Sequence, residues 1–394
     1  MSDYIRLGEL VTLQRGTTYK GAQLGEPGPV LLGLGAIQRN GGFRADNLKT
    51  YGGDSPAKLI LGPGDLFLSL KDVAHAADLL GALARVPRHV AAGRLTQDTV
   101  RLDLTSDRVS SEYLYWSLRT PDYREYCRSH ATGTTNLGLS REDFFAYRIP
   151  APSLERVHMV QLLGALDDKI AANSKRTETI DLYLAAVFGE IRSRCEQQGF
   201  LRDVADINGD SVKPVAGGTL RYIDIASVGV GDYEYPDVIA WEEAPSRARR
   251  GVRKGDTIWS TVRPNRRSHA LNLSADPLLV ASTGLAVLSP REVGFAYLYE
   301  VTKCPAFTTY LERAAEGSAY PAVRADRFGD ALIPIFPHAE HDGFEATAAP
   351  MRELAHSLEV ENRTLSATRD ALLPQLMSGK IRVKDAEKTF GEVL

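Results

Sequence analysis

Residues 157–197, VHMVQLLGALDDKIAANSKRTETIDLYLAAVFGEIRSRCEQ, carry two sets of positions that recur every seven residues. The sets consist of Leu163, Ile170, Thr177, Leu184 and Ile191, and, three positions on, Leu166, Asn173, Ile180 and Val187. Mostly apolar side chains with this spacing form one stripe along a helix and predict a coiled-coil seam. Such a helix is about 60 Å long at 1.5 Å per residue, so it needs a partner along its length.

We expect that partner in the same chain, between residues 344 and 378. A second heptad stripe there consists of Met351, Leu358, Leu365 and Leu372. The sequence therefore predicts two long helices that pair with each other. We expect Ser153 to cap the first helix, Gly199 to end it, and Pro374 to kink or stop the second.

Composition permits many folds but excludes some classes of protein. The chain has 394 residues, 43% hydrophobic and 25% charged, which is typical of a soluble globular protein with two or three domains. A net charge of −3 does not favour nucleic-acid binding, although it leaves room for a local basic face. The three cysteines have no metal-ligand spacing, and no long apolar run suggests a membrane segment. We therefore expect a cytoplasmic protein without a structural metal.

The chain repeats itself, which predicts two copies of one structural plan. Pairs of matching residues 184 positions apart are Tyr113 and Tyr297, Leu114 and Leu298, Tyr115 and Tyr299, Pro121 and Pro305, Tyr126 and Tyr310, Gly133 and Gly317, Phe144 and Phe328, and Ile149-Pro150 and Ile333-Pro334. Towards the start of each half the spacing widens, to 191 for Gly64-Asp65 and Gly255-Asp256. Small insertions of this kind are typical of surface loops.

Each half contains the same predicted elements. Short apolar runs bounded by Gly, Pro and Asp predict strands at residues 29–37, 65–70 and 99–104, and at 219–228, 256–262 and 278–288. Residues 111–130 predict two short helices that meet at Pro121, and residues 294–314 are their counterpart.

These patterns together predict an α+β fold with an internal duplication. Two similar modules of mixed strands and short helices are separated by two long antiparallel coiled-coil helices. The predicted bounds are residues 1–152 for the first module, 153–198 for the central helix, 199–337 for the second module, 338–379 for the C-terminal helix and 380–394 for a tail.

Sequence motifs of catalysis are absent from the chain. There is no GxxxxGKS or GxxxxGKT phosphate loop, no HExxH, no GxSxG and no pair of cysteine ligands. Gly64-Asp65 and Gly255-Asp256 recur, but a turn leading into a strand explains them. We therefore expect no catalytic, cofactor-binding or metal-binding residue in this chain.

Basic residues are dense between positions 247 and 267. They are Arg247, Arg249, Arg250, Arg253, Lys254, Arg263, Arg266 and Arg267, interrupted by the single acid Asp256. Arginine can neutralise phosphates and bond guanine with two donors, yet a charge run is more often solvated surface. Two similar modules with basic loops at a fixed spacing favour DNA binding, because a reader of two separated half-sites needs that arrangement.

The candidate DNA-contacting residues lie on loops of both modules. In the first module they are Arg15, Thr17, Thr18, Lys20, Lys71, His75, Thr134, Thr135 and Asn136. In the second module they are Arg247, Arg249, Arg263, Asn265, Arg266, Arg267, His269, Ser318 and Tyr320. We expect fewer than half to touch a base rather than a phosphate or solvent. Since Asp72 and His75 stand where the second module is rich in arginine, the two modules should read unrelated sequences.

Several segments carry a resemblance to one family over essentially the whole chain. They are LGELVTLQRGTTYKG (7–21), GPGDLFLSL (62–70), LDDKIAANSKRTETIDLYLAAVFGEI (166–191), RKGDTIWSTVRP (253–264), GSAYPAVRADRFGDALIPIF (317–336) and LLPQLMSGKI (372–381). Because these segments occur in this order in both halves, the chain resembles the specificity (S) subunit of a Type I restriction-modification system. The resemblance implies that each module is a target recognition domain and that the antiparallel helices set the gap between two DNA half-sites.

The resemblance also implies which partners the chain has. They are double-stranded DNA, two methyltransferase subunits docked on the helices, and restriction and translocase subunits. Adenine methylation, ATP-driven translocation and cleavage would belong to these partners, which would hold the S-adenosylmethionine, ATP and Mg²⁺. The chain itself would be a non-catalytic recognition subunit in phage defence.

Two other functions stay open at the level of sequence. The paired helices suit a coiled-coil interaction scaffold that does not read DNA. A stand-alone DNA methyltransferase or nuclease would need a cofactor loop or an acidic metal cluster, and the sequence has neither. Within the helices, Asn173 and Asn362 set the helix register or are simply solvated.

Overall fold

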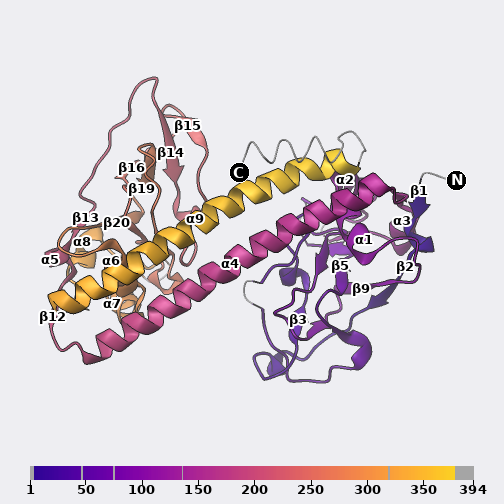
Figure 1. The fold of residues 1–394 in the computed structure, drawn as a ribbon, viewed down its shortest axis with the longest axis horizontal. Coiled ribbons are helices and arrows are strands. Elements are labelled where there is room, and N and C mark those ends of the chain that lie inside the picture. Colours follow the sequence, from indigo (N-terminus) through magenta and orange to yellow (C-terminus); the bar gives the residue numbers. More distant parts are fainter. Residues whose placement is uncertain (1–3, 46–47, 74–75, 135, 318–319, 378–394) are drawn as a thin grey trace. The chain divides into compact units, whose positions relative to one another are not determined.

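The computed structural model describes residues 4–45, 48–73, 76–134, 136–317 and 320–377 (Figure 1). The chain divides into two compact units. Unit 1 consists of Met1–Ile170 and Arg363–Leu394, and unit 2 consists of Ala171–Asn362. Each unit therefore contains one globular module and part of each long helix. In the described ranges, no helix is both long and apolar enough to cross a membrane.

The module of unit 1 is built on a four-stranded antiparallel sheet. Its order is β2 (Val11–Arg15), β9 (Thr99–Leu104), β5 (Leu66–Ser69) and β7 (Leu83–Arg85). A second sheet has the order β3 (Val30–Leu32), β8 (Gly93–Leu95) and β4 (Ile60–Leu61), in which β3 and β8 are parallel. Shorter pairs join β1 (Tyr4–Arg6) to β11 (Arg148–Pro150) and β6 (Lys71–Asp72) to β10 (Leu137–Gly138). The helices are α1 (Ser111–Ser117), α2 (Pro121–Ser129), α3 (Arg141–Ala146) and the 3-10 turns η1 (Leu7–Glu9), η2 (Gly21–Gln23), η3 (Leu34–Ala36) and η4 (Ala57–Leu59).

The module of unit 2 has the same plan. Its main sheet has the order β13 (Ala205–Ile207), β20 (Leu285–Pro290), β17 (Thr257–Ser260) and β18 (His269–Leu271). The second sheet has the order β15 (Val238–Ala240), β14 (Thr219–Ile223), β19 (Leu279–Ser282) and β16 (Ala248–Gly251), and β12 (Gln198–Phe200) pairs with β21 (Leu332–Pro334). The helices are α5 (Leu201–Val204), α6 (Phe295–Lys303), α7 (Pro305–Ala314), α8 (Ala325–Gly329) and the 3-10 turns η5 (Ile225–Ser227) and η6 (Pro264–Arg266).

The structure confirms the internal duplication. The order of the main sheet is the same in both units, and each second sheet contains one parallel pair, β3 with β8 and β14 with β19. Individual hydrogen bonds recur as well. The Tyr126 hydroxyl donates to the Asp143 carbonyl over 2.8 Å, and the Tyr310 hydroxyl donates to the Arg327 carbonyl over 2.8 Å. The repeated tyrosines thus hold equivalent helices in both modules.

The recurring Gly-Asp pairs are turns that start the central strands, as predicted. Gly64 and Gly255 have φ angles of 90° and 94°, a left-handed conformation that glycine adopts without strain. The Asp65 carboxylate accepts a hydrogen bond of 2.8 Å from the Gly62 amide, and the Asp256 carboxylate accepts one of 2.7 Å from the Arg253 amide. Each aspartate thereby closes the turn before β5 or β17.

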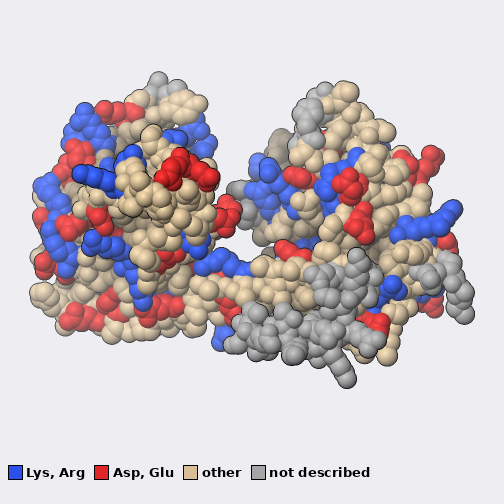
Figure 2. Space-filling view, turned by 90° about the horizontal axis from the view of Figure 1, so that it is seen from above, with Lys and Arg blue, Asp and Glu red and all other residues tan. Residues whose placement is uncertain are grey.

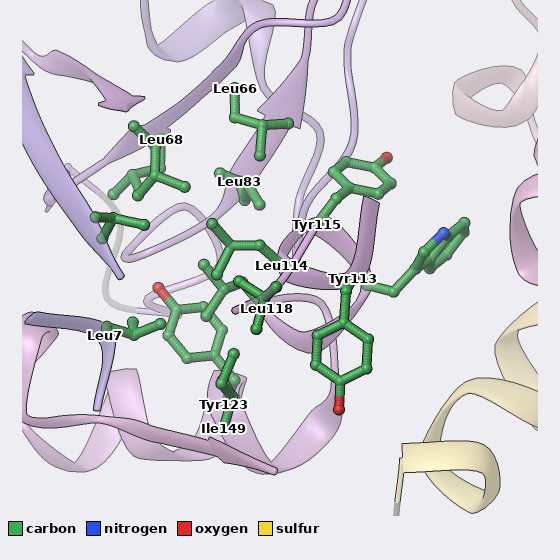
Figure 3. Close-up of a cluster of buried hydrophobic side chains, with 14 of the residues drawn as sticks. Leu7, Leu66, Leu68, Leu83, Tyr113, Leu114, Tyr115, Leu118, Tyr123 and Ile149 are labelled. Atoms are coloured by element: carbon green, nitrogen blue, oxygen red, sulfur yellow. The ribbon is translucent and has the colours of Figure 1, made fainter. Parts of the chain in front are cut away.

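The core of unit 1 packs α1 and α2 on the main sheet (Figure 3). Leu66 and Leu83 from the sheet join Tyr113 and Leu114 from α1 in one buried cluster. Fully burying each large apolar side chain contributes about 1.5–3 kcal/mol relative to exposure. The polar end of Tyr123 is satisfied, since its hydroxyl donates to the Gly81 carbonyl over 3.0 Å. This cluster fixes the sheet against the helices.

The long helices are α4 (Leu154–Arg194) and α9 (His338–Met377), and within each unit they run antiparallel. In unit 1, Leu163 near the start of α4 shares a core with Leu372 near the end of α9. In unit 2, Phe188 near the end of α4 shares a core with Phe344 near the start of α9. Every predicted seam position is buried or half-buried, so the heptad pattern is confirmed.

The helix ends agree only partly with the sequence. Ser153 caps α4 as predicted, because its hydroxyl oxygen accepts a 3.3 Å hydrogen bond from the Arg156 amide. The prediction that Gly199 ends α4 is wrong, since α4 ends at Arg194 and Gly199 pairs with Ile333 in β12 and β21. Pro374 does not stop α9, which continues to Met377. Pro374 is exposed, so water can bind the carbonyl left without an amide partner.

Two further expectations about elements have clear outcomes. Two short helices do meet at Pro121, which is the first residue of α2. Residues 278–288 are not one strand but two, because β19 and β20 belong to different sheets and Thr283-Gly284 lie between them. The predicted tail, residues 380–394, lies outside the described residues.

Asn173 interrupts the apolar seam with a polar contact between the helices. Its side chain is 1% exposed, and its amide nitrogen donates to Glu361 Oε2 over 2.7 Å and to Asn362 Oδ1 over 3.0 Å. Asn362 in turn donates to Ser174 Oγ over 3.2 Å. Sliding the helices by one turn would leave a buried amide without partners, so the pair fixes the register of α4 and α9 in unit 2.

A buried charge network ties the module of unit 2 to both helices. Arg352 of α9 contacts Glu300 of α6 and Asp181 of α4, and the side chains of Arg352 and Glu300 are only 6% and 2% exposed. Lys303 Nζ lies 3.2 Å from Asp181 and 3.3 Å from Glu300. Burial raises the pKa of Asp181, but Arg352 and Lys303 outweigh burial and hold this pKa below its usual value.

Neutralising Glu300 should destabilise unit 2 strongly. Glu300→Gln leaves the buried Arg352 and the half-buried Lys303 with Asp181 as their remaining partner in the network, which should cost about 3–5 kcal/mol. The measurement is the midpoint of urea unfolding. As a matched control, Glu178→Gln removes an exposed ion pair with Lys175 and should cost less than about 1 kcal/mol. Equal midpoints for the two variants would show that the network contributes no more than a surface pair.

Candidate nucleic-acid interface

One edge of the main sheet has the same construction in both units. In unit 1, Ser69 at the end of β5 pairs with Thr99 at the start of β9, and Arg15 at the end of β2 pairs with Val100. In unit 2, Ser260 at the end of β17 pairs with Leu285 at the start of β20. We call this edge and its loops the strand-end surface; it comprises residues 15–20, 71–72, 132–134 and 136–138 in unit 1 and residues 247, 261–267, 283–284 and 320–322 in unit 2.

The strand-end surface joins two loops that are far apart in the sequence. After β5, Lys71-Asp72 pair with Leu137-Gly138, and after β17, Val262 pairs with Ala322. The same turn leads into both pairings, because Ser69 Oγ donates to the Lys71 carbonyl over 2.6 Å and Ser260 Oγ donates to the Val262 carbonyl over 2.9 Å. Candidate residues predicted from separate segments therefore meet on one surface in each unit.

Most candidates of unit 1 are exposed on this surface. The exposed ones are Arg15, Thr17, Thr18, Lys20, Lys71, Thr134 and Asn136. His75 and Thr135 lie outside the described residues. Lys71 Nζ lies 3.5 Å from Asp98 Oδ1, an exposed pair that water screens, so Lys71 keeps most of its positive potential.

Arg94 supports the first of these loops, and sequence reasoning did not identify it. Arg94 is 3% exposed, and its guanidinium donates to Thr17 Oγ1 over 3.1 Å and to the Thr18 carbonyl over 3.2 Å. It also lies over the Tyr51 ring, 4.9 Å from the centroid. The role of Arg94 depends on a contact between β8 and a distant loop, which no local pattern shows.

A hollow of about 420 Å³ opens beside the same loop. Its polar lining includes Tyr19, Arg44, Lys49, Thr96 and Asp98. These side chains were not among the predicted site residues, because they come from three separate segments of unit 1. The hollow extends the strand-end surface with both donors and acceptors.

The candidates of unit 2 differ in exposure. Arg247, Asn265, Arg266 and Tyr320 are exposed, whereas Arg249, Arg263 and Arg267 are half-buried. Ser318 lies outside the described residues. Arg247 belongs to the strand-end surface because its carbonyl accepts a 2.8 Å hydrogen bond from the Thr283 amide. Arg267 is partly used for structure, since its guanidinium donates to the Lys303 carbonyl over 3.0 Å.

His269 is a correction, because it lies in the core rather than at the surface. It is 1% exposed, and its ring stacks on Trp259 with 4.7 Å between centroids. Its Nδ1 lies 2.6 Å from the Arg267 carbonyl, which fits a neutral ring that donates from Nδ1. Buried in this way, His269 cannot contact DNA, and we remove it from the candidates.

Charge on the molecular surface is mixed rather than uniformly basic. Figure 2 shows Lys and Arg interspersed with Asp and Glu on the visible face of each unit. Within the basic cluster, Arg253 pairs with Asp210 and Lys254 pairs with Glu353, over 2.9 Å and 2.8 Å. The structure gives Arg247, Arg263 and Arg266 no ion pair with any described carboxylate. These three arginines therefore place unpaired positive charge on the strand-end surface of unit 2.

Among the described residues, no group of three or more His, Cys, Asp or Glu side chains is placed to hold a metal ion. The described residues instead form two duplicated, polar strand-end surfaces, each carried by a module that continues into a long helix. Such a surface can bind a polyanion and present side chains to base edges.

The fold is that of a Type I specificity subunit. The chain superposes on the crystal structure of the Type I restriction-modification system S subunit from M. genitalium with a TM-score of 0.60, at 13% identity and over 95% of each chain. The HsdS subunit from Thermoanaerobacter tengcongensis aligns at 17% identity over 96% of this chain and 97% of that chain, with a TM-score of 0.34. No family model matches the sequence, and no curated protein matches it either.

The burial of His269 should make unit 2 sensitive to acid. Burial lowers the pKa of His269 from 6.5 to about 4. Between these two pH values the imidazole ring stays neutral in the folded protein, whereas in the unfolded chain it takes up a proton. Stability should therefore fall as the pH decreases from about 6.5 to about 4, by about 3 kcal/mol. His269→Phe keeps the ring stack and removes this titration.

The measurement is the midpoint of urea unfolding at pH 7.0 and 4.5. The difference between the two midpoints should shrink in His269→Phe, whatever the variant's stability at pH 7.0. The exposed His158 provides the matched control, and His158→Gln should keep the wild-type difference. An unchanged difference in His269→Phe would contradict the prediction.

Proposed function

We propose that this chain is a specificity subunit of a Type I restriction-modification system, which reads a bipartite, asymmetric DNA site and catalyses nothing itself. The observation that carries the proposal is the strand-end surface, built twice on duplicated modules. Its support is threefold: exposed Arg, Lys, Thr and Asn side chains on this surface, the whole-chain fold shared with an S subunit, and the order of the sequence segments.

Each strand-end surface would read one half-site. Arg and Lys side chains would bind phosphates and set the position on the duplex, while a smaller set would contact base edges. At positions that match in the duplication, the two surfaces carry side chains of different chemistry. Asp72 in unit 1 is buried, whereas its counterpart Arg263 in unit 2 reaches the surface. The two half-sites should therefore be unrelated, which makes the target asymmetric.

The long helices would act as a spacer between the half-sites. Both α4 and α9 contribute residues to both units, and the Asn173 contacts oppose sliding of one helix along the other. A fixed distance turns the second readout into an intramolecular step at high effective concentration. Two short and individually weak readouts would thus become one tight and specific one.

The exposed faces of the helices would dock two methyltransferase subunits. Adenine methylation would use S-adenosylmethionine on those subunits, and translocation and cleavage would use ATP and Mg²⁺ on restriction subunits. The chain would contribute the choice of DNA sequence, and its place would be the cytoplasm.

The test is selection of bound DNA from a randomised double-stranded library by the full chain with its methyltransferase partner. Two short conserved blocks at one fixed spacing are expected. Enrichment of no bipartite sequence would overturn the proposal and favour an interaction scaffold without DNA readout. Titration of the isolated chain with S-adenosylmethionine tests the other alternative, since tight binding would favour a stand-alone methyltransferase.

Lengthening both helices together should change the spacing and nothing else. One added heptad in each helix, after Ile170 in α4 and after Asn362 in α9, adds about 10 Å, or about three base pairs of DNA. Selection from the same library should return the wild-type half-sites with a gap about three base pairs longer. The control places the heptad in α4 alone, which breaks the seam and should abolish bipartite binding. An unchanged gap in the double insertion would refute the spacer role.

A further inference from the structure

The loop between β17 and β18 in unit 2 is held at both ends. At its start, the Arg263 amide donates to the Pro321 carbonyl over 2.7 Å, and at its end the Arg267 guanidinium donates to the Lys303 carbonyl over 3.0 Å. Pro264 between them is buried. The loop backbone is therefore anchored to the segment around Pro321 and to α6.

Two arginines of this loop adopt a backbone conformation that glycine adopts readily and that is unfavourable for arginine. Arg263 and Arg267 have φ angles of 52° and 57°, in the left-handed region. Each costs on the order of 1–2 kcal/mol, and the surrounding hydrogen bonds must outweigh that cost. At position 263 glycine would remove the strain, whereas at position 267 the arginine side chain also anchors the loop to the Lys303 carbonyl. The Arg263 side chain is therefore present at a cost in backbone strain.

The Arg263 guanidinium rests on an aromatic ring. Its Cζ lies 4.5 Å from the centroid of Tyr320, whose side chain is 69% exposed. Stacking restricts the guanidinium plane and costs none of its five N–H donors. Since Arg263 forms no ion pair with a described carboxylate, these donors are available to a ligand. By contrast, Arg266 on the same loop is exposed, and no ring contact of it is recorded among the described residues.

A guanidinium held in this way suits one kind of ligand on DNA. Guanine presents two acceptors, O6 and N7, at one edge in the major groove, and a planar fork bonds both at once. A phosphate contact needs charge but little orientation, so an exposed arginine such as Arg266 serves it equally well. The preorganised Arg263 loses less conformational entropy on forming a two-donor contact.

The equivalent position of unit 1 cannot make this contact. Asp72, 191 residues earlier, is 0% exposed, and its Oδ2 accepts a 2.7 Å hydrogen bond from the Leu79 amide. The position faces the interior in unit 1 and the surface in unit 2. We propose that Arg263, held on Tyr320, specifies one guanine in the half-site read by unit 2, an inference that rests on the proposed function.

The experiment selects DNA from a randomised double-stranded library with the full chain and its methyltransferase partner. Wild type should require a guanine at one position of one half-site. Arg263→Lys keeps the charge and loses the fork, so preference for that guanine over other bases should fall about 10- to 100-fold. The other half-site and the gap should stay as in wild type, which shows in the same molecule that the variant is folded.

Variants of Tyr320 test the ring separately. Tyr320→Phe keeps an aromatic face and should keep the guanine preference, whereas Tyr320→Leu should weaken it. Arg327→Ala removes an exposed arginine on α8, outside the strand-end surface, and should leave both half-sites unchanged.

The outcomes separate this inference from the proposed function. If Arg263→Lys selects the wild-type site, or if Arg263→Ala weakens binding to all sequences equally, Arg263 contacts a phosphate and the inference is wrong while the proposed function stands. Loss of preference at a base other than guanine also overturns it. If wild type selects no bipartite site, both fail.

Discussion

In both units, an aspartate of α4 contacts two basic side chains. One comes from the end of the helix that follows the main sheet, α1 or α6, and the other is an arginine of α9. In unit 1, Arg119 and Arg369 lie 3.5 Å and 2.6 Å from the Asp167 carboxylate. In unit 2, Lys303 and Arg352 contact Asp181. The rest of the structure depends on this three-way contact, because it joins each module to both long helices at once. Loss of an acidic partner is costly for Arg119 and Arg352, because these two side chains are largely buried and would carry a poorly compensated charge.

In these contacts, each of the two long helices carries charge of one sign. The acids lie on α4 and the bases on α9 in both units, although the sequence duplication alone would not separate them. Pairing of α4 with α9 brings opposite charges together, whereas pairing of either helix with a second copy of itself would bring like charges together. Because the duplication gives the chain two similar helices, α4 could pair with α9 or with α4 of a second copy. The contacts of Asp167 and Asp181 favour the intramolecular pair of α4 with α9.

The duplicated parts and the divergent parts of the modules have different physical roles. Sheet order, the Gly-Asp turns and the tyrosine hydrogen bonds recur, because each module must bury the same face against its helices. The strand-end surface is where the modules differ, as Asp72 and Arg263 illustrate. Loops at the end of a rigid sheet can change without loss of the core, so a new recognition surface leaves the fold intact.

The sequence by itself determined the elements whose signals are local or periodic. The seven-residue repeat of Leu163 and Leu184 predicted the helix pair, Pro121 predicted the break between α1 and α2, and the spacing of matching residues predicted the duplication, because each follows from rules that act along the chain. Only the tertiary structure decided the rest. Gly199 became part of a strand because β21 lies beside it, and His269 became a core residue because Trp259 stacks on it. The strand-end surface likewise exists because pairings such as Val262 with Ala322 join segments that are distant in sequence, and contacts at that distance leave no periodic trace.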